Sequence, residues 1–216
     1  MTKISNDEAL APTRRAALMF AAGATLAGAA GIRSARATSD DETILTEAAV
    51  LRDPDVPVTG NLEGDITIVE WSDYQCPYCR RVEPELRQIV QDDGKVRLVM
   101  KDWPIFGDAS RDAALMALSA GPRYAEVVDA LMANQRALSP HRTDAILDTV
   151  GADAAVIRAG LGAREAELDA LLDRTNGQAS AFGLRGTPAL VIGGNLYRRG
   201  MPVAELRQAV AKARAA

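Results

Sequence analysis

The sequence predicts an α/β fold in which a central mixed β-sheet carries an inserted helical subdomain. Three observations lead to this prediction: a strand–helix–strand run over residues 65–101, a helical block over 109–182, and a strand–strand–helix run at the end of the chain. Strand–helix–strand with short connections is the βαβ unit of parallel sheets, whereas a tight turn joins antiparallel strands. A sheet that contains both kinds of pair is mixed.

The first run is marked by changes in residue type. Residues 65–71 are β-branched and apolar apart from their acidic members, which indicates a buried strand. Residues 77–91 follow as a helix with Pro77 just inside its start, where proline is well tolerated. Residues 96–101 form the second strand of the unit.

The middle of the chain, residues 109–182, is rich in Ala, Leu, Glu, Asp and Arg and predicts four or five helices. Breaks are expected at Gly121-Pro122, at Ser139-Pro140, near Gly151 and at Gly160–Gly162. The apolar stripes of these helices are interpreted as core packing.

The end of the chain returns to strands. Residues 187–192 predict a strand opened by a proline, 193–195 (Gly-Gly-Asn) a hairpin turn, and 196–199 the returning strand. An amphipathic helix from Pro202 to about residue 215 completes the pattern.

A polar, turn-rich lead-in precedes the first strand, and within it residues 40–43 are placed to cap a short helix over 44–51. The predicted organisation begins with a removable N-terminal segment (1–37) and this lead-in (38–64). A first α/β half (65–108), a helical insertion (109–182) and a second α/β half (183–216) follow.

Residues 1–37 are typical of an export signal. A polar start containing Arg14-Arg15 precedes a weakly apolar run, and Ala35-Arg36-Ala37 has the A-x-A pattern of a cleavage site. The paired arginines are similar to the twin-arginine export motif. We therefore expect cleavage after Ala37 and a periplasmic protein, with an uncleaved membrane anchor as the alternative.

Composition excludes several classes of protein. The 216 residues are 48% hydrophobic and 25% charged, as in ordinary globular chains. A net charge of -4 argues against a nucleic-acid binder, which should present a basic face. Two Cys and one His cannot supply the four ligands of a closed Cys/His zinc site. These counts therefore exclude a closed zinc site. No other metal and no dissociable cofactor are expected.

The two cysteines form a Cys-x-x-Cys pair, Cys76 and Cys79, placed between a strand and a helix. A cysteine at a helix N-terminus faces unpaired N–H groups and the positive end of the helix dipole, both of which stabilise a thiolate. The second cysteine lies one turn further on and can close a disulfide with the first. This placement in a βαβ unit favours a redox-active pair over a structural disulfide, which would close only a very small loop.

The chain resembles the thioredoxin superfamily, and most closely its bacterial DsbA-type thiol:disulfide oxidoreductases, in which helices are inserted into a thioredoxin fold. The resemblance covers about residues 50–215. It is based on residues 69–79 around the cysteines, on Pro84 within the following helix, on 101–107 after the second strand, and on Gly186-Thr187-Pro188. The lead-in Asp53-Pro54-Asp55…Gly60-Asn61, together with the combination of Cys-Pro-Tyr-Cys (with Pro77 and Tyr78 as its middle residues) and Thr187-Pro188, suggests the subgroup that includes DsbG and the copper-sensitivity-suppressor type C proteins.

The resemblance implies a role for each matched residue. Cys76 would be the attacking thiolate and Cys79 the resolving thiol. Pro188, expected to be cis, would turn backbone near Thr187 toward the sulfurs, where family members pair with an extended substrate peptide. Tyr78 is expected to tune the pair.

A carboxyl group lies in the first strand, six residues before the first cysteine. A buried carboxylate is costly unless it is paired or protonated, and the family's buried acid occupies this spacing. We expect Glu70 to relay the proton of Cys79, with Lys101 on the neighbouring strand as its partner. The alternative is an exposed Glu with a solvated Lys. Trp71 and Trp103 are assigned to the core rather than to the site.

The sequence thus predicts an exported, monomeric enzyme that exchanges dithiols and disulfides with protein clients and is recycled by a membrane redox partner. The direction of exchange stays open: an oxidase forms client disulfides, whereas an isomerase or reductase is kept reduced. A non-catalytic, chaperone-like binding module on the same fold is the alternative from another class, since fold does not imply function.

Overall fold

The computed structural model describes residues 44–216. The elements of this part are α2 (Glu47–Leu51), β1 (Val58–Gly60), β2 (Ile66–Ser72), α3 (Pro77–Asp93), β3 (Val96–Asp102), α4 (Asp108–Leu118), a 3₁₀ turn (Gly121–Arg123), α5 (Tyr124–Ala133), α6 (Pro140–Thr149), α7 (Ala154–Ala181), β4 (Ala189–Ile192), β5 (Asn195–Tyr197) and α8 (Val203–Arg214). The export signal predicted over residues 1–37 lies outside the described residues.

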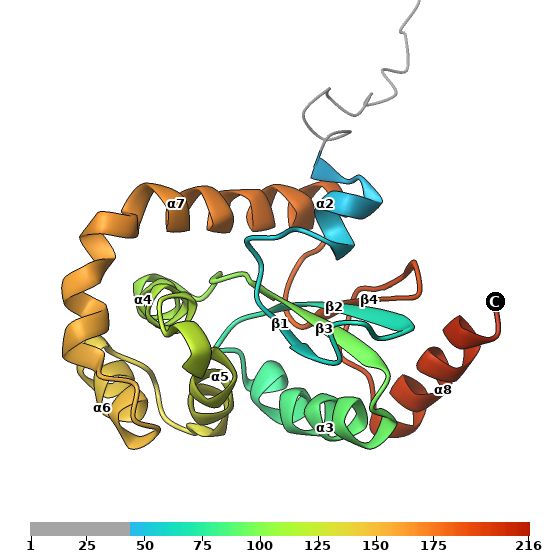
Figure 1. The fold of residues 1–216 in the computed structure, drawn as a ribbon, viewed down its shortest axis with the longest axis horizontal. Helices are drawn as coiled ribbons and strands as arrows, with labels where there is room; N and C mark the ends of the chain where they lie inside the picture. Colours follow the sequence, from blue (N-terminus) through green and yellow to red (C-terminus); the bar gives the residue numbers. More distant parts are fainter. Residues whose placement is uncertain (1–43) are drawn as a thin grey trace, which may run out of the picture. The chain divides into compact units, whose positions relative to one another are not determined.

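The five strands form one sheet in the order β1-β3-β2-β4-β5 (Figure 1). Strands β2 and β3 are parallel, and the other neighbouring pairs are antiparallel. The predicted mixed sheet is confirmed, and helices α4 to α7 come between β3 and β4 as the predicted insertion.

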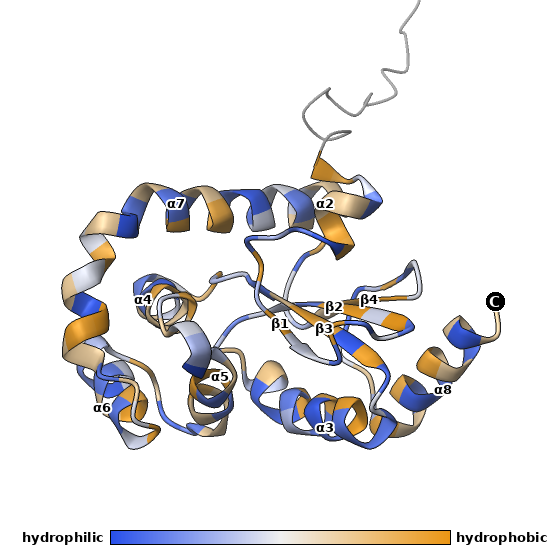
Figure 2. Cartoon of the chain, in the orientation of Figure 1, coloured by the Kyte–Doolittle hydropathy of each residue, from blue (hydrophilic) through white to orange (hydrophobic). Residues whose placement is uncertain are grey.

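Each face of the sheet is covered by its own helices. Side chains alternate between faces along a strand, so Ile66 and Ile68 enter a core with α3, α8 and the inserted helices, whereas Val69 and Trp71 enter a second core with α2 and the end of α7. In Figure 1, α3 and α8 lie on one side of the sheet and α2 and α7 on the other. Figure 2 shows hydrophobic residues along the strands and mixed colours on the helices.

Strand β1 was not predicted. It pairs antiparallel with β3, with Val58 opposite Val99 and Gly60 opposite Arg97. Gly60 has a φ of 72°, and a Cβ there would lie 2.6 Å from the Val96 carbonyl oxygen, so the close approach requires glycine. A three-residue edge strand between a proline and a glycine has the composition of a turn, and only its pairing with β3 makes it a strand.

Three predicted breaks in the helical block are confirmed, at the 3₁₀ turn, at the N-cap of α6, Ser139, and at Gly151. The expected break at Gly160–Gly162 was wrong, because α7 runs unbroken through both glycines (Figure 1). A helical glycine costs only about 1 kcal/mol relative to alanine. The helix formers around these two glycines and the packing of Leu168 and Leu172 sustain the helix.

The short N-terminal helix begins later than predicted. Its N-cap is Thr46, whose hydroxyl accepts a hydrogen bond from the Ala49 N–H at 3.1 Å, so α2 starts at Glu47 rather than at residue 44. The hairpin between β4 and β5 turns at Gly193 and Gly194, both with positive φ, as a tight two-residue turn requires.

Candidate active site

Cys76 is held at the start of α3, where the preceding strand ends. It is the N-cap residue, and its Sγ accepts a hydrogen bond from the Cys79 N–H at 3.5 Å. The cap position follows from the local sequence, because Pro77 fits the first helical position and leaves the cap to the residue before it. The structure therefore places this thiol at a helix N-terminus, as predicted.

The pKa of Cys76 is lowered to about 5. The main cause is the hydrogen bond from the Cys79 thiol; the Thr187 side chain and the backbone N–H groups of Cys79 and Tyr78 add to it, against the opposing effect of burial. A thiolate at this position is therefore stable at neutral pH. Because the thiolate is the nucleophilic form of cysteine, Cys76 is prepared for attack on a disulfide.

Cys79 has the opposite character. It has no exposed surface, and its pKa is raised by burial, by its hydrogen bond to Cys76 and by the charge of Glu70. Both cysteines are free thiols in this structure. One sulfur of the pair thus favours the charged form, and the other stays protonated until a base takes its proton.

The loop before β4 lies against the pair. Ala189 pairs with Trp71 across the antiparallel β2–β4 ladder, so the residues just before β4 reach the end of β2 and the start of α3. The Thr187–Pro188 peptide bond is cis, as expected. In its thiol form, Cys76 donates a hydrogen bond from Sγ to the Thr187 carbonyl oxygen at 3.3 Å, which brings residues 111 positions apart into one site.

Glu70 is fully buried in β2 beneath the pair. It aligns with Met100 on β3 and Leu190 on β4, in the core that also contains Cys79. Burial raises its pKa well above the usual value, and the nearby carboxylate of Glu83 raises it further. Among residues 44–216, no N–H or O–H group donates to either of its carboxyl oxygens. Burial therefore favours the neutral form of Glu70, and its ionised form is a stronger base than an exposed carboxylate.

Glu83 is a site residue that sequence reasoning missed. It is 1% exposed, on the inner face of α3 one turn after Cys79, and its Oε1 accepts a hydrogen bond from Arg87 Nε at 2.7 Å. Its carboxylate is near enough to Glu70 to raise the pKa of that acid. The available signal was periodicity, because an acid four residues after Cys79 and three residues before Leu86 lies on the apolar face of the helix.

The pairing predicted between Glu70 and Lys101 was wrong. In the β2–β3 register, Lys101 aligns with Trp71 and not with Glu70, so it points to the opposite face of the sheet. There its Nζ donates a hydrogen bond to the Ala49 carbonyl oxygen at 3.4 Å and lies 6.0 Å from the centre of the Trp71 ring. Burial lowers the pKa of Lys101 to about 8. The lysine belongs to the α2 side of the molecule, away from the cysteines.

The two tryptophans lie in the core, as predicted. Trp71 has no exposed surface and makes an edge-to-face contact with Phe182, with 5.6 Å between ring centres. Trp103 is 7% exposed, and its indole N–H donates to Asn176 on α7 at 3.0 Å. Tyr78, in contrast, is 61% exposed beside the cysteines, under the guanidinium group of Arg81.

Asp73 fixes the loop that leads into the cysteine pair, and it too was missed. Its carboxylate accepts hydrogen bonds from the Gln75 N–H, from Ile105 and Phe106 in the loop after β3, and from Ser110 on α4, at 2.7 to 3.0 Å. One buried acid therefore ties the residue before Cys76 to the inserted helical block. Three of its four partners lie more than 30 residues away in the sequence, so no local pattern reveals that Asp73 positions this loop.

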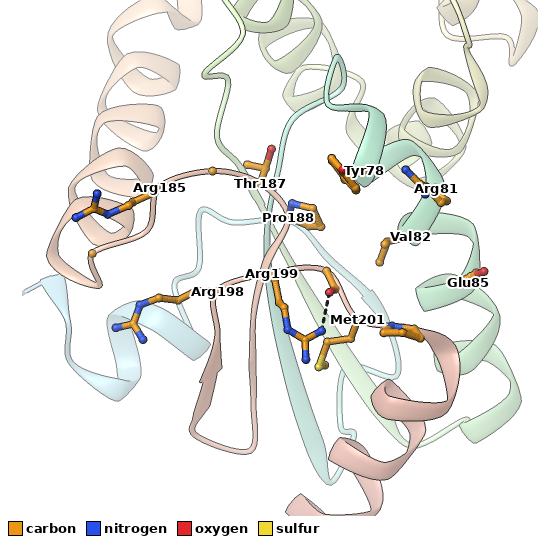
Figure 3. Close-up of a pocket in the computed structure, with 14 residues that line it drawn as sticks. Tyr78, Arg81, Val82, Glu85, Arg185, Thr187, Pro188, Arg198, Arg199 and Met201 are labelled. Atoms are coloured by element: carbon orange, nitrogen blue, oxygen red, sulfur yellow. Dashed lines mark hydrogen bonds between the residues drawn. The ribbon is translucent and has the colours of Figure 1, made fainter.

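A groove of about 980 Å³ opens beside the site (Figure 3). Residues of α3, including Tyr78 and Val82, form one wall, and Arg185, Thr187 and Arg198 line the other. Pro188 and Met201 lie between the walls. The groove thus begins beside residues that surround the sulfurs, and its volume is in the range of sites that bind ligands.

Replacing Glu70 by Gln is expected to slow disulfide exchange by at least about tenfold, because a positioned acid or base contributes this much or more to proton transfer. Alkylation of Cys76 in the reduced protein should keep its rate, since it needs no proton at Cys79. Thiol-exchange rates and alkylation rates measured over one pH range test this role. Equal exchange rates for the two proteins would show that Glu70 relays no proton.

The same variant has a stability signature. The folded pKa of Glu70 is raised above its unfolded value of about 4.3. The buried acid therefore lowers the free energy of unfolding increasingly as pH rises above that value, because the unfolded chain ionises first. Thermal unfolding should therefore show Glu70→Gln gaining stability over the wild type between pH 4.5 and pH 8. An exposed carboxylate would produce no such trend.

Known proteins share this fold and sequence pattern. The thioredoxin family model matches residues 52–212. A thioredoxin-like oxidoreductase from Silicibacter pomeroyi DSS-3 is 35% identical, with a TM-score of 0.75 over 79% of this chain and 99% of that one. A periplasmic thioredoxin-like protein from Salmonella enterica serovar Typhimurium is 26% identical, with a TM-score of 0.70 over 78% and 95%. The catalytic domain of Proteus mirabilis ScsC, 22% identical, shares the fold, with a TM-score of 0.73 over 82% and 99%.

The chain also resembles part of two longer proteins. A protein named Na(+)/H(+) antiporter NhaA 3, from Salinispora tropica, is 30% identical over 91% of this chain, and NhaA 1 from Salinispora arenicola is 28% identical over 84%. The chain spans only 30% and 28% of the length of these relatives. Among residues 44–216, no helix is long and apolar enough to cross a membrane.

Proposed function

This chain belongs to the thioredoxin family, and from that premise we propose that it is an exported thiol:disulfide oxidoreductase that forms disulfides in protein clients through Cys76 and Cys79. The observation that carries the proposal is the asymmetry of the pair. One thiol at a helix start has a pKa lowered to about 5, and its buried neighbour has a raised pKa. A structural disulfide needs no such difference.

The exchange takes place in two displacements. A client thiolate attacks Sγ of Cys76 in the oxidised pair, forms a mixed disulfide and breaks the Cys76–Cys79 bond. Cys79 leaves and takes a proton, for which Glu70 in its neutral form is the donor. A second client thiolate then attacks the client sulfur of the mixed disulfide, and Cys76 leaves as a stable thiolate. Two electrons pass from the client dithiol to the cysteine pair.

The low pKa of Cys76 favours the oxidising direction. A disulfide is a stronger oxidant when its reduced form is stabilised, and the stabilised thiolate is such a form. The exported location is proposed from the signal-like residues 1–37 and from the periplasmic relative of Salmonella enterica. A membrane redox partner would then reoxidise the pair after each turnover, which makes the protein catalytic rather than stoichiometric.

Equilibration with glutathione buffers of known ratio, followed by alkylation and mass measurement, gives the reduction potential of the pair. We expect a value more positive than about −200 mV, toward the oxidising end of the thioredoxin-like range. The oxidised protein should also introduce disulfides into reduced, unfolded ribonuclease. A potential near −270 mV, with insulin reduction but no ribonuclease oxidation, would instead identify a client reductase. Absence of exchange in both assays would support a binding module.

A further inference from the structure

The groove beside the cysteine pair is lined by four arginines: Arg81 from α3, Arg185 from the loop before β4, and Arg198 and Arg199 from the segment after β5. Figure 3 shows Arg185 and Arg198 on one side and Arg81 on the other, with Pro188 between them. All four residues are exposed. The cationic groups thus come from elements far apart in the sequence and surround one groove.

Three of these arginines have no carboxylate partner among residues 44–216. Arg81 lies 4.9 Å over the ring of Tyr78, and Arg198 donates to the Phe182 carbonyl oxygen at 3.1 Å. Arg185 makes neither a hydrogen bond nor an ion pair within this part of the chain. Only Arg199 is neutralised, by Glu205 at 2.6 Å.

Several arginines elsewhere in residues 44–216 are neutralised by acids. Arg158, Arg174 and Arg214 each pair with two carboxylates. The chain as a whole carries a net charge of -4. A group of unpaired cations on an acidic protein is a local concentration of positive potential, and such clefts attract ligands of the opposite sign.

The groove also has an apolar floor and one opposing charge. Val82, Pro188 and Met201 are buried beneath the rim, and Gly200 is so closely packed that a Cβ there would lie 3.0 Å from Pro188 Cγ. Glu85 on α3 is the one acidic residue that lines the groove. Three unpaired cations face this single carboxylate, so the groove stays cationic.

We propose that the groove selects client segments with acidic side chains close to the reacting cysteine. This inference rests on the proposed function, because it takes the occupant to be the client peptide that reacts with Cys76. If the client pairs as an extended strand with backbone near Thr187, its alternate side chains face the protein. Glutamates two residues from the client cysteine would then point toward the arginines, and glutamates one residue away would point to solvent.

The test uses short, extended peptides with one cysteine linked through a disulfide to thionitrobenzoate. Attack of the Cys76 thiolate on the peptide sulfur forms a mixed disulfide and releases the coloured thiolate. Peptides carry Glu, Gln or Lys two residues from the cysteine on each side, and a fourth peptide carries Glu one residue away. We expect the peptide with Glu two residues from the cysteine to react about five- to tenfold faster than the Lys peptide. This ratio is the size expected if its two glutamates each form one exposed ion pair with an arginine. Added salt should reduce the difference.

Variants separate the groove from net charge. Arg185→Gln with Arg198→Gln should remove most of the preference for Glu, whereas Arg123→Gln with Arg142→Gln, on the inserted helices, removes the same net charge and should keep it. Glu85→Gln should increase the preference. The ratio of Glu to Lys rates within one protein is the readout, so a general loss of folding or reactivity does not imitate the effect.

The outcomes distinguish this inference from the proposed function. If no peptide reacts faster with the wild type than with Cys76→Ser, the exchange activity itself fails. If all peptides react at one rate, or if the Gln peptide reacts fastest without salt dependence, exchange stands and the selection of acidic segments is overturned. Equal effects of the two double variants would also overturn it.

Discussion

Replacing Cys79 by Ser is expected to convert the protein from a catalyst into a trap for its clients. The Cys76 thiolate can still attack a client disulfide, but no buried thiol remains to displace the client from the mixed disulfide. With insulin as a model client, the variant should accumulate an adduct of the protein with one insulin chain, and turnover should fall to the uncatalysed rate. Mass spectrometry under non-reducing conditions measures the adduct, and a reductant should release it.

The matched control is Cys76→Ser, which retains the other thiol. Cys79 has no exposed surface and a raised pKa, so this variant should form no adduct. The two single substitutions remove the same group from positions three residues apart and should give opposite results. Equal adduct formation by both variants would contradict the assignment of attacking and resolving thiols.

The second large effect is expected in the pH profile of alkylation. With a pKa of about 5, Cys76 is fully ionised above about pH 6. Its reaction with iodoacetamide should therefore be nearly constant from pH 6 to 9 and fall tenfold per unit below pH 5. An ordinary cysteine, with a pKa of about 8.5, rises tenfold per unit up to that pH. Mass analysis of the alkylated peptide assigns the reaction to Cys76.

The midpoint of this profile is more informative than the rate. A thiolate of low pKa is intrinsically less nucleophilic: the logarithm of its rate constant falls by about 0.4–0.5 for each unit by which the pKa falls. A shift of about 3.5 units raises the thiolate fraction at pH 6 roughly 300-fold but lowers the reactivity per thiolate roughly 40-fold. The net rate advantage is therefore modest, whereas the midpoint moves by the full shift. A midpoint above pH 8 would exclude a stabilised thiolate.

The same thiolate stabilises the folded, reduced protein. Because the folded pKa lies below the unfolded one, this contribution is complete above about pH 8.5 and is lost as pH falls through about 5. Comparison of reduced wild type with Cys76→Ser in thermal unfolding isolates it. The stability advantage of the wild type should shrink as pH falls from 8.5 to 4.5.

Local signals in the sequence accounted for the strand–helix–strand unit and the cysteine pair. Pro77, the strand before it and the helix periodicity act over a few residues, so they could be identified without knowledge of the rest of the chain. The break expected at Gly160–Gly162 shows the limit of this approach. Glycine weakens a helix only moderately, and contacts made by the rest of α7 decide whether the helix continues.

The environment of Glu70 shows why the remainder of the site was not predictable. The sequence places a carboxyl group in a buried strand, but strand register decides which side chains share its face, and a shift of one residue reverses the choice. In the structure this register turns Lys101 away, and the packing of α3 brings Glu83 to Glu70 instead. The identity of the charged group beside Glu70 therefore depends on packing between elements.

By itself, the sequence determined the position of the cysteine pair at a helix start and the mixed sheet around it, because these depend on residue type and short-range spacing. Only the tertiary structure decided that Thr187 contacts Cys76 and that arginines from three segments line one groove. The reason is physical: the path of β4 beside β2 and the position of α3 on the sheet are set by the burial of side chains from the whole chain, which no local pattern encodes.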